Sequence, residues 1–436
     1  MMESTYTRDR LGRISTRSES AGGEGFAEAY GYELSGRLDT VHRGGALVSD
    51  YGFDSNGNRT SHRIGAASSL RDRVWPCLGD LAGTAEVTVA GSFDAQDRML
   101  SYGTCQYEYT RNGELTRRTD SASGAVTNYQ YDEFGNLRRV DLADARVVTY
   151  HIDGLNRRVG KSIDGVRQWG LLYANQLEPV AELDGAGNIV TSFLYADRPH
   201  VPSLMLKGGH TYRILSDHLG SVRLVIDLAD GSIAQRLAYD EYGNVIEDTN
   251  PGFQPFAYAG GLYDRDAGLT RFGARDYDAV AGRWTAKDRL NVISAYPNRY
   301  YYCGDDPINL LDINGEVYYV IAVAAIAIGV GWYIVDKHVI SPSETSEHFA
   351  EMAQSKIDVD NIDKEIDRLN DMLDRCLYNE CTAEEQAMCS DGTVEDRILE
   401  LKKEQIGEAW QAGEHAKEAV KSNMPLPSIN DLSKPR

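Results

Sequence analysis

The chain is poor in proline and cysteine, with 12 prolines and six cysteines among 436 residues. The scarcity of proline excludes extensive polyproline linkers, and 42 glycines indicate many tight turns instead. Cys77, Cys105 and Cys303 lack the spacing of metal ligands, and we expect them to be reduced thiols. The histidines form no H-x-x-x-H pair and no cluster with cysteine. The sequence therefore predicts neither a metal site nor a cofactor.

Positive charge is also in short supply. The chain has 45 Lys and Arg against 66 Asp and Glu, a net charge of -21. Nucleic acids are bound by positively charged surfaces, so this balance argues against a nucleic-acid partner. The first residues are polar and lack the apolar stretch of a secretory signal. If the protein leaves the cell, we expect it to be secreted without a signal peptide.

What the sequence has in abundance is a repeated aromatic–acidic–x–x–Gly motif. Successive copies are often 21 or 22 residues apart, which suits a strand, a tight turn and a return strand. The Asp side chain can accept from backbone N–H groups of the turn, and Gly takes the positive φ that the turn needs. One hairpin cannot bury its own face, so neighbouring units must stack. The copies are YTRDRLGRI at Tyr6, YGYELSGRL at Tyr30, YGFDSNGNR at Tyr51, YEYTRNGEL at Tyr107, YQYDEFGNL at Tyr129, YHIDGLNRR at Tyr150 and LAYDEYGNV at Leu237.

These copies resemble the tyrosine-aspartate repeats of the Rhs/YD-repeat family. SDHLGSVRLVID from Ser216, RFGARDYDAVAGRWTAKD from Arg271 and YYYCGDDPINLLDINGE from Tyr300 resemble the Rhs repeat-associated core that closes the array. The resemblance implies a mainly β fold, in which an antiparallel hairpin ribbon forms part of a shell around a C-terminal toxin. It implies a YD-repeat array over 1–209 and the core domain over 210–316. Because full shells of the family have many more repeats, we interpret the chain as the truncated C-terminal part of an array.

The resemblance also implies self-cleavage. In the family, two aspartates in D-P-x-G-like motifs form a proteolytic pair, and they match Asp288 in KDRLN and Asp312 in LDINGE. Two carboxyl groups in close approach cannot both ionise readily, so one can act as a base towards water and the other as an acid. Cleavage is expected between Gly315 and Glu316.

Both motifs are altered in this sequence. Arg289 and Ile313 replace the prolines, and Asn291 replaces the glycine of the first motif. Two interpretations therefore stay open: either the pair cleaves the chain, or both aspartates are turn residues. We expect three other acidic residues of the core, Asp276, Asp305 and Asp306, to be turn and salt-bridge residues.

An uncharged segment follows the core. Val317–Val335 has no charged residue over 19 positions, and as a helix with a rise of ~1.5 Å per residue it would be about 28 Å long, close to the ~30 Å hydrocarbon core of a bilayer. Small residues at helix-packing spacing, Ala325 with Gly329 and Ala327 with Gly331, could bring two such helices together. We predict a transmembrane helix, and the alternative is a buried helix within the shell.

The remaining residues, 336–436, predict a variable helical domain. Apolar residues recur at steps of three and four, which predicts packed helices at 346–376 and 394–421. Cys376, Cys381 and Cys389 flank the connecting loop, and their redox state stays open.

Two functions are compatible with these features. The first is an Rhs-type polymorphic toxin with a membrane-acting C-terminal domain for interbacterial competition. Its expected partners are a membrane, an immunity protein and a delivery machinery such as type VI secretion, and its only expected enzymatic activity is self-cleavage. The alternative is a non-toxic scaffold with a membrane-anchored helical hairpin.

Overall fold

The computed structural model describes residues 2–72, 75–79, 81, 86–196, 198, 200–288, 298–315 and, by backbone alone, 319–320. Contacts divide the chain into two units, 1–321 and 322–436, and all described residues lie in the first. This part consists of β-strands and three short 3-10 helices, so the predicted mainly β fold is confirmed there. The apolar segment 317–335, apart from the backbone of 319–320, and the helices predicted at 346–376 and 394–421 lie outside the described residues. A search of the described residues for helices long and apolar enough to cross a bilayer found none.

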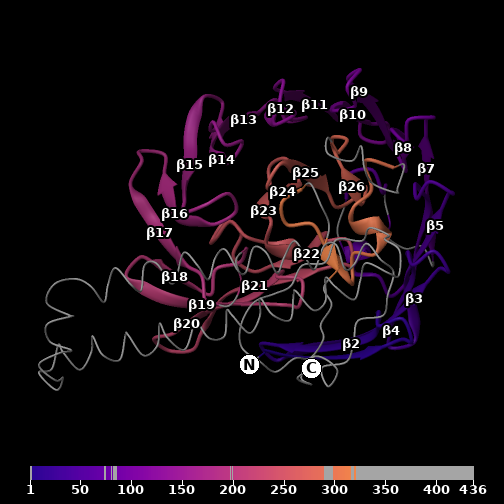
Figure 1. Ribbon diagram of the computed structural model, residues 1–436, viewed down its shortest axis with the longest axis horizontal. Helices are drawn as coiled ribbons and strands as arrows, with labels where there is room; N and C mark the ends of the chain where they lie inside the picture. The colour runs from indigo at the N-terminus through magenta and orange to yellow at the C-terminus, as the bar shows by residue number, and fades with distance from the viewer. Residues whose placement is uncertain are drawn as a thin grey trace, which may run out of the picture. The chain divides into compact units, whose positions relative to one another are not determined.

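The first 22 strands form one antiparallel meander, in which each strand pairs with the next along the chain. Figure 1 shows this ribbon curving around the later strands β23–β26. The strands are β1 Met2–Arg8, β2 Ile14–Ala21, β3 Glu24–Tyr32, β4 Leu38–Arg43, β5 Ala46–Phe53, β6 Arg59–Ile64, β7 Val87–Phe93, β8 Met99–Tyr102, β9 Cys105–Tyr109, β10 Leu115–Asp120, β11 Val126–Tyr131, β12 Leu137–Asp141, β13 Val147–Ile152, β14 Arg158–Ile163, β15 Val166–Tyr173, β16 Pro179–Asp184, β17 Ile189–Leu194, β18 Leu204–Lys207, β19 His210–Ser216, β20 Val222–Asp227, β21 Ile233–Tyr239 and β22 Val245–Asp248.

The repeated motif forms the turns between these strands. In the β5–β6 turn, the backbone N–H groups of Asn56 and Asn58 both donate to Asp54 Oδ1 at 2.9 Å. Gly57 occupies the positive φ of 82°. Two backbone N–H groups likewise donate to Asp132 and to Asp153, and the positive φ belongs to Gly135 in the first turn and to Asn156 in the second. The turn chemistry predicted from the sequence is therefore present in successive repeats.

The repeat tyrosines supply the inner face of the ribbon. Tyr51 and Tyr150 are among the largest fully buried side chains. Burying an aromatic ring removes a large apolar area from water, and its hydroxyl still finds a polar partner. Tyr150, for example, donates to Asp264 Oδ2 at 2.8 Å.

One excursion interrupts the meander between β6 and β7. It contains the 3-10 helix η1 (Ser69–Asp72) and places Cys77 against β9, where a disulfide joins Cys77 to Cys105. The expectation that these two cysteines are reduced thiols is therefore wrong, whereas Cys303 is a buried free thiol. The spacing gave no sign of the pair, because the excursion brings together residues 28 positions apart.

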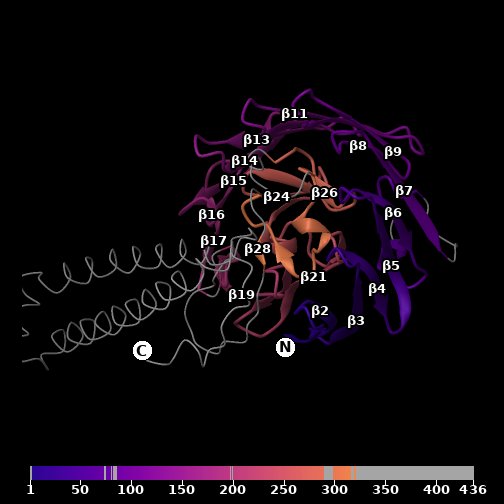
Figure 2. The ribbon, with the colours of Figure 1, turned by 45° about the vertical axis from the view of Figure 1, so that its right-hand side comes forward.

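The beginning and end of the ribbon lie side by side (Figure 2). Glu19 Oε1 on β2 and Arg223 Nε on β20 form an ion pair with a separation of 2.8 Å. Arg236 on β21 donates to the carbonyl of Gly22 at 2.8 Å. Tyr6 on β1 lies 3.3 Å from the His218 ring nitrogen. These contacts join the first strands of the ribbon to its last strands, so that the ribbon encloses an interior.

The interior holds a compact segment, residues 256–288 and 298–315, which we call the plug. It contains η2 (Tyr258–Gly260), β23 (Leu262–Asp264), β24 (Leu269–Phe272), β25 (Arg275–Asp278), β26 (Arg283–Trp284), η3 (Cys303–Asp305) and β27 (Leu310–Leu311), which pairs with β28 (Tyr319–Val320). Its aromatic centre includes Tyr277 and Tyr302, whose ring centroids are 4.4 Å apart, and Trp284 at 5.5 Å from Tyr302. The densest turn-rich part of the sequence is thus the centre of the shell.

Candidate self-cleavage site

The plug brings the two predicted aspartates to one arginine. Asp288 follows β26 and Asp312 follows β27, yet both lie beside Arg275 at the start of β25. Arg275 Nη2 is 3.1 Å from Asp288 Oδ2 and 3.2 Å from Asp312 Oδ2. All three residues are buried. The two carboxyl groups are therefore within reach of a single guanidinium nitrogen.

Arg275 also contacts the backbone at the predicted cleavage point. Its Nε donates to the carbonyl oxygen of Gly315, and its guanidinium lies 4.2 Å from the centroid of the Trp284 ring. A donor on this oxygen would stabilise the negative charge that develops when a nucleophile attacks the carbonyl carbon. Glu316, the residue on the other side of the bond, lies outside the described residues.

Arg275 is not among the site residues predicted from the sequence. Its side chain is separated from Asp288 and Asp312 by 13 and 37 positions, so no local spacing indicated the contact. The available signal was its position in GARDYD, inside the stretch that resembles the core. A buried arginine in the core needs acidic partners. Asp288 and Asp312 were the candidate aspartates to which the sequence assigned no cationic partner.

The segment before the candidate bond is held by the turn between β24 and β25. Ala274 N–H donates to the carbonyl of Asn314 at 2.8 Å. Gly315 adopts a φ of 66°. On the far side, Leu310 pairs with Val320 and Leu311 with Tyr319, so the candidate bond lies in the connection between two paired strands.

A cavity of about 280 Å³ opens beside this segment. The plug contributes Arg275, Lys287, Asp288 and Gly315 to its wall, and the turns of the ribbon contribute Asn112, Glu133, Asn156 and Gln176. A cavity of this volume holds several water molecules, and its polar lining supplies partners for them. The cavity can therefore hold water beside Gly315.

Comparison with known proteins identifies the family. Residues 1–308 match the family model described as the teneurin YD-shell. The chain belongs to the YD-shell family. The resemblance of its repeats to the Rhs/YD-repeat family is confirmed.

Relatives of two kinds share this YD shell. Mouse Teneurin-4 is 30% identical over 318 residues, which cover 70% of this chain and 11% of the relative. The toxin protein Tse5 of Pseudomonas aeruginosa is 25% identical over 345 residues, which cover 68% of this chain and 26% of the toxin. The chain thus spans about a tenth of the teneurins and about a quarter of Tse5. Among solved structures, a TcdB2-TccC3-TEV chain matches with a TM-score of 0.46 and 16% identity over 72% of this chain and 18% of its own length.

Three other acidic residues of the YD-shell plug make contacts within the shell. Asp276 accepts from Arg158 at 2.9 Å and from Arg271 at 3.0 Å, so its predicted role as a salt-bridge residue is confirmed. Asp305 lies 3.9 Å from Arg37, and Asp306 accepts from the backbone N–H of Asn309 at 3.2 Å. Burial raises the pKa of Asp305 to about 7 and that of Asp306 to about 6.

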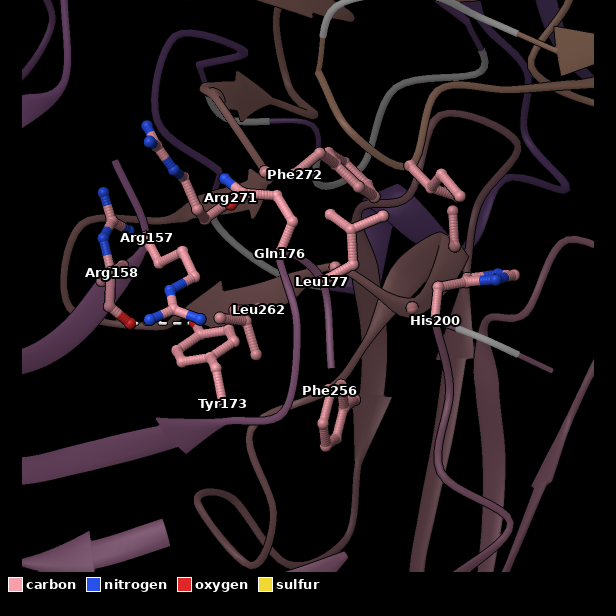
Figure 3. A pocket seen from close by; sticks show the side chains of 15 residues that line it. Arg157, Arg158, Tyr173, Gln176, Leu177, His200, Phe256, Leu262, Arg271 and Phe272 are labelled. Atoms are coloured by element: carbon pink, nitrogen blue, oxygen red, sulfur yellow. Dashed lines mark hydrogen bonds between the residues drawn. The ribbon is translucent and has the colours of Figure 1, made fainter. Parts of the chain in front are cut away.

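A second cavity lies between ribbon and plug, and Gly273 and Ile313 also line it. Figure 3 shows its arginines, Arg157, Arg158 and Arg271, on one side of Gln176 and Leu177, and His200 on the other. Its volume is about 40 Å³, room for one or two water molecules. Arg157 is paired with Asp153, and the other two arginines with Asp276. This cavity therefore belongs to the structural interface.

The remaining predicted site residues belong to the apolar segment after the plug. Ala325, Ala327, Gly329 and Gly331 lie outside the described residues. Among the residues that are described, no group of three His, Cys, Asp or Glu side chains could hold a metal ion.

Proposed function

We propose that this YD shell carries a C-terminal segment and separates it from the shell by hydrolysis of the Gly315–Glu316 bond. The observation that carries the proposal is the convergence of Asp288, Asp312 and the Gly315 carbonyl on Arg275. No other pair of acidic residues in the described plug touches the same cation next to a backbone carbonyl of the connection between β27 and β28.

The proposed chemistry follows from the positions of these groups. Water from the adjacent cavity attacks the carbonyl carbon of Gly315, and one carboxylate of the pair accepts the proton of that water. Arg275 Nε–H stabilises the oxyanion. The protonated partner of the pair donates to the nitrogen of Glu316 as the C–N bond breaks. The products are a Gly315 carboxylate and a new amino terminus at Glu316.

Variants of the full-length protein test this reaction. On a denaturing gel, the wild type should yield a shell fragment and a tail fragment, whereas Asp288→Asn and Asp312→Asn should stay intact, because an amide can neither accept the proton nor donate it as an acid. Asp306→Asn is the matched control, since Asp306 is a buried plug aspartate without contact to Arg275. An intact wild type, or cleavage that survives both substitutions, would exclude the aspartate pair.

The cargo in this proposal is a membrane-acting toxin used between bacteria. Its support is the uncharged span Val317–Val335 and the family relationship to a protein named as a toxin. The shell would shield the apolar span from water until release, since a large exposed apolar patch favours aggregation. Such a toxin requires delivery machinery and an immunity protein in the producing cell. Before delivery the chain would reside in the cytoplasm, and afterwards the span would enter the membrane of the target.

A further inference from the structure

We infer that the turn between β24 and β25, residues 272–275, is a positioning element that holds segment 312–315 for cleavage, and that Gly273 and Gly315 are required because neither has a side chain. The inference rests on the self-cleavage proposed above and names the element that selects the bond. It assigns to Gly273, which touches no reacting atom, a role in the reaction.

The turn holds the segment through three contacts. The backbone N–H of Ala274 donates to the carbonyl of Asn314 at 2.8 Å. The side chain of Arg275 donates through Nε to the carbonyl of Gly315 and through Nη2 to Asp312 Oδ2 at 3.2 Å. The turn thus holds the carbonyls of Asn314 and Gly315 and the carboxylate of Asp312. These contacts place the peptide bond that follows Gly315.

The turn and the segment lie so close together that neither Gly273 nor Gly315 has room for a side chain. A Cβ atom on Gly273 would lie 2.3 Å from the carbonyl oxygen of Asn314. A Cβ atom on Gly315 would lie 2.3 Å from the carbonyl oxygen of Phe272 and 2.9 Å from the backbone nitrogen of Arg275. The obstructing atoms belong to the backbone, so no change of rotamer can relieve the overlap. A side chain at either position must push the segment off the turn.

When the segment is displaced from the turn, the Gly315 carbonyl moves away from Arg275. Displacement of a reacting group by about 1 Å can cost on the order of 100-fold in rate. The turn therefore accepts a segment with glycine immediately before the cleaved bond and rejects segments with any larger residue there.

Alanine substitutions with a matched control test the inference. Gly273→Ala and Gly315→Ala introduce the overlap. Gly268→Ala serves as the control, because Gly268 has the same positive φ of 66° as Gly315, yet a Cβ atom there would meet no heavy atom within 4 Å. All three variants carry the same kind of backbone strain, so only the collision distinguishes the control. In the full chain, we expect the cleavage rate to fall about 100-fold in the first two variants and to stay within a few-fold of wild type in Gly268→Ala.

A second measurement does not depend on cleavage. Hydrogen exchange of the peptide that contains the Ala274 amide reports whether Asn314 occupies the turn, and it is measured in the Asp288→Asn background, where every chain should be uncut. Protection should be lost in Gly273→Ala and Gly315→Ala and kept in Gly268→Ala. Equal protection in all three would overturn the inference. If the wild type is never cleaved, the self-cleavage proposal fails, while the exchange result still decides whether the turn holds the segment. Should Gly273→Ala fail to fold, Gly315→Ala applies the same collision from the end of the segment.

Discussion

Arg158 and Asp276 form a buried ion pair that joins the ribbon to the plug. Arg158 Nη2 lies 2.9 Å from Asp276 Oδ1, and the exposed fractions of the two side chains are 2% and 1%. The residues are 118 positions apart, on β14 and β25. Arg271 supplies a second guanidinium to the same carboxylate. Arg158, the first residue of β14, thus ties its hairpin to the plug.

Removal of this carboxylate should destabilise the shell. Asp276→Asn leaves two buried guanidinium groups without their anion, and breaking a buried pair in this way typically costs about 3–5 kcal/mol. Urea unfolding followed by circular dichroism measures the loss. Asp144→Asn, which removes an exposed partner of Arg146, should leave the midpoint nearly unchanged. Similar midpoints for both variants would show that the inward pair does not hold the plug.

The stability that Asp305 and Asp240 contribute to the shell should fall as the pH rises from about 4 to about 7. Burial raises the pKa of Asp305 to about 7, and burial together with Glu241 raises that of Asp240 to about 7, from an ordinary 3.8. Between pH 3.8 and about 7, the two carboxyl groups are protonated in the folded state and ionised in the unfolded state. Their contribution to stability therefore falls as the pH rises. Asp305 alone accounts for a change on the order of 4 kcal/mol, since one pKa unit is worth about 1.4 kcal/mol.

The difference between wild type and Asp305→Asn isolates this effect. The variant keeps the shape of the side chain and removes its titration, so its unfolding free energy should depend less on pH, and it should be the more stable protein at pH 8. Urea midpoints at pH 5 and pH 8 provide the test. Parallel pH profiles for the two proteins would show that Asp305 does not titrate in this window.

Reduction of the Cys77–Cys105 disulfide should lower the stability of the excursion between β6 and β7. A cross-link over 28 positions removes about 3.5 kcal/mol of chain entropy from the unfolded state. Dithiothreitol should therefore lower the melting temperature of the wild type and leave Cys105→Ser unaffected. Equal responses to reductant in both proteins would argue against the cross-link.

The tail beyond the shell should enter bilayers through Val317–Val335. Placing arginine at the middle of the span, in Ala325→Arg, should cost about 2.5–3.5 kcal/mol of insertion free energy. Flotation with liposomes and dye release compare the wild-type tail, residues 317–436, with this variant. We expect the wild-type tail to float and release dye and the variant to do neither. Identical behaviour of the two would favour the alternative of a buried helix.

Growth of bacteria that express the tail alone separates toxin from scaffold. A membrane-acting toxin should arrest growth, and Ala325→Arg should relieve the arrest. Normal growth with the wild-type tail would favour a passive membrane anchor.

Local features of the fold could be predicted from the sequence, and long-range contacts could not. The turn around Asp54 depends on residues within four positions of one another, so its motif reveals it. The excursion that pairs Cys77 with Cys105 has no repeat motif to indicate its path. The two aspartates were found through family motifs, although the motifs are altered. Arg275 was missed because its partners come from separate parts of the chain and meet only when the plug packs.

Intact mass spectrometry of the purified full-length protein tests the central claim most directly. It identifies the cleaved bond, which a gel cannot do. The account predicts two chains, a shell fragment that ends at Gly315 and a tail that begins at Glu316, together with a single uncut mass for Asp312→Asn. A wild type that retains its full mass after prolonged incubation, or fragments that end at another residue, would contradict it.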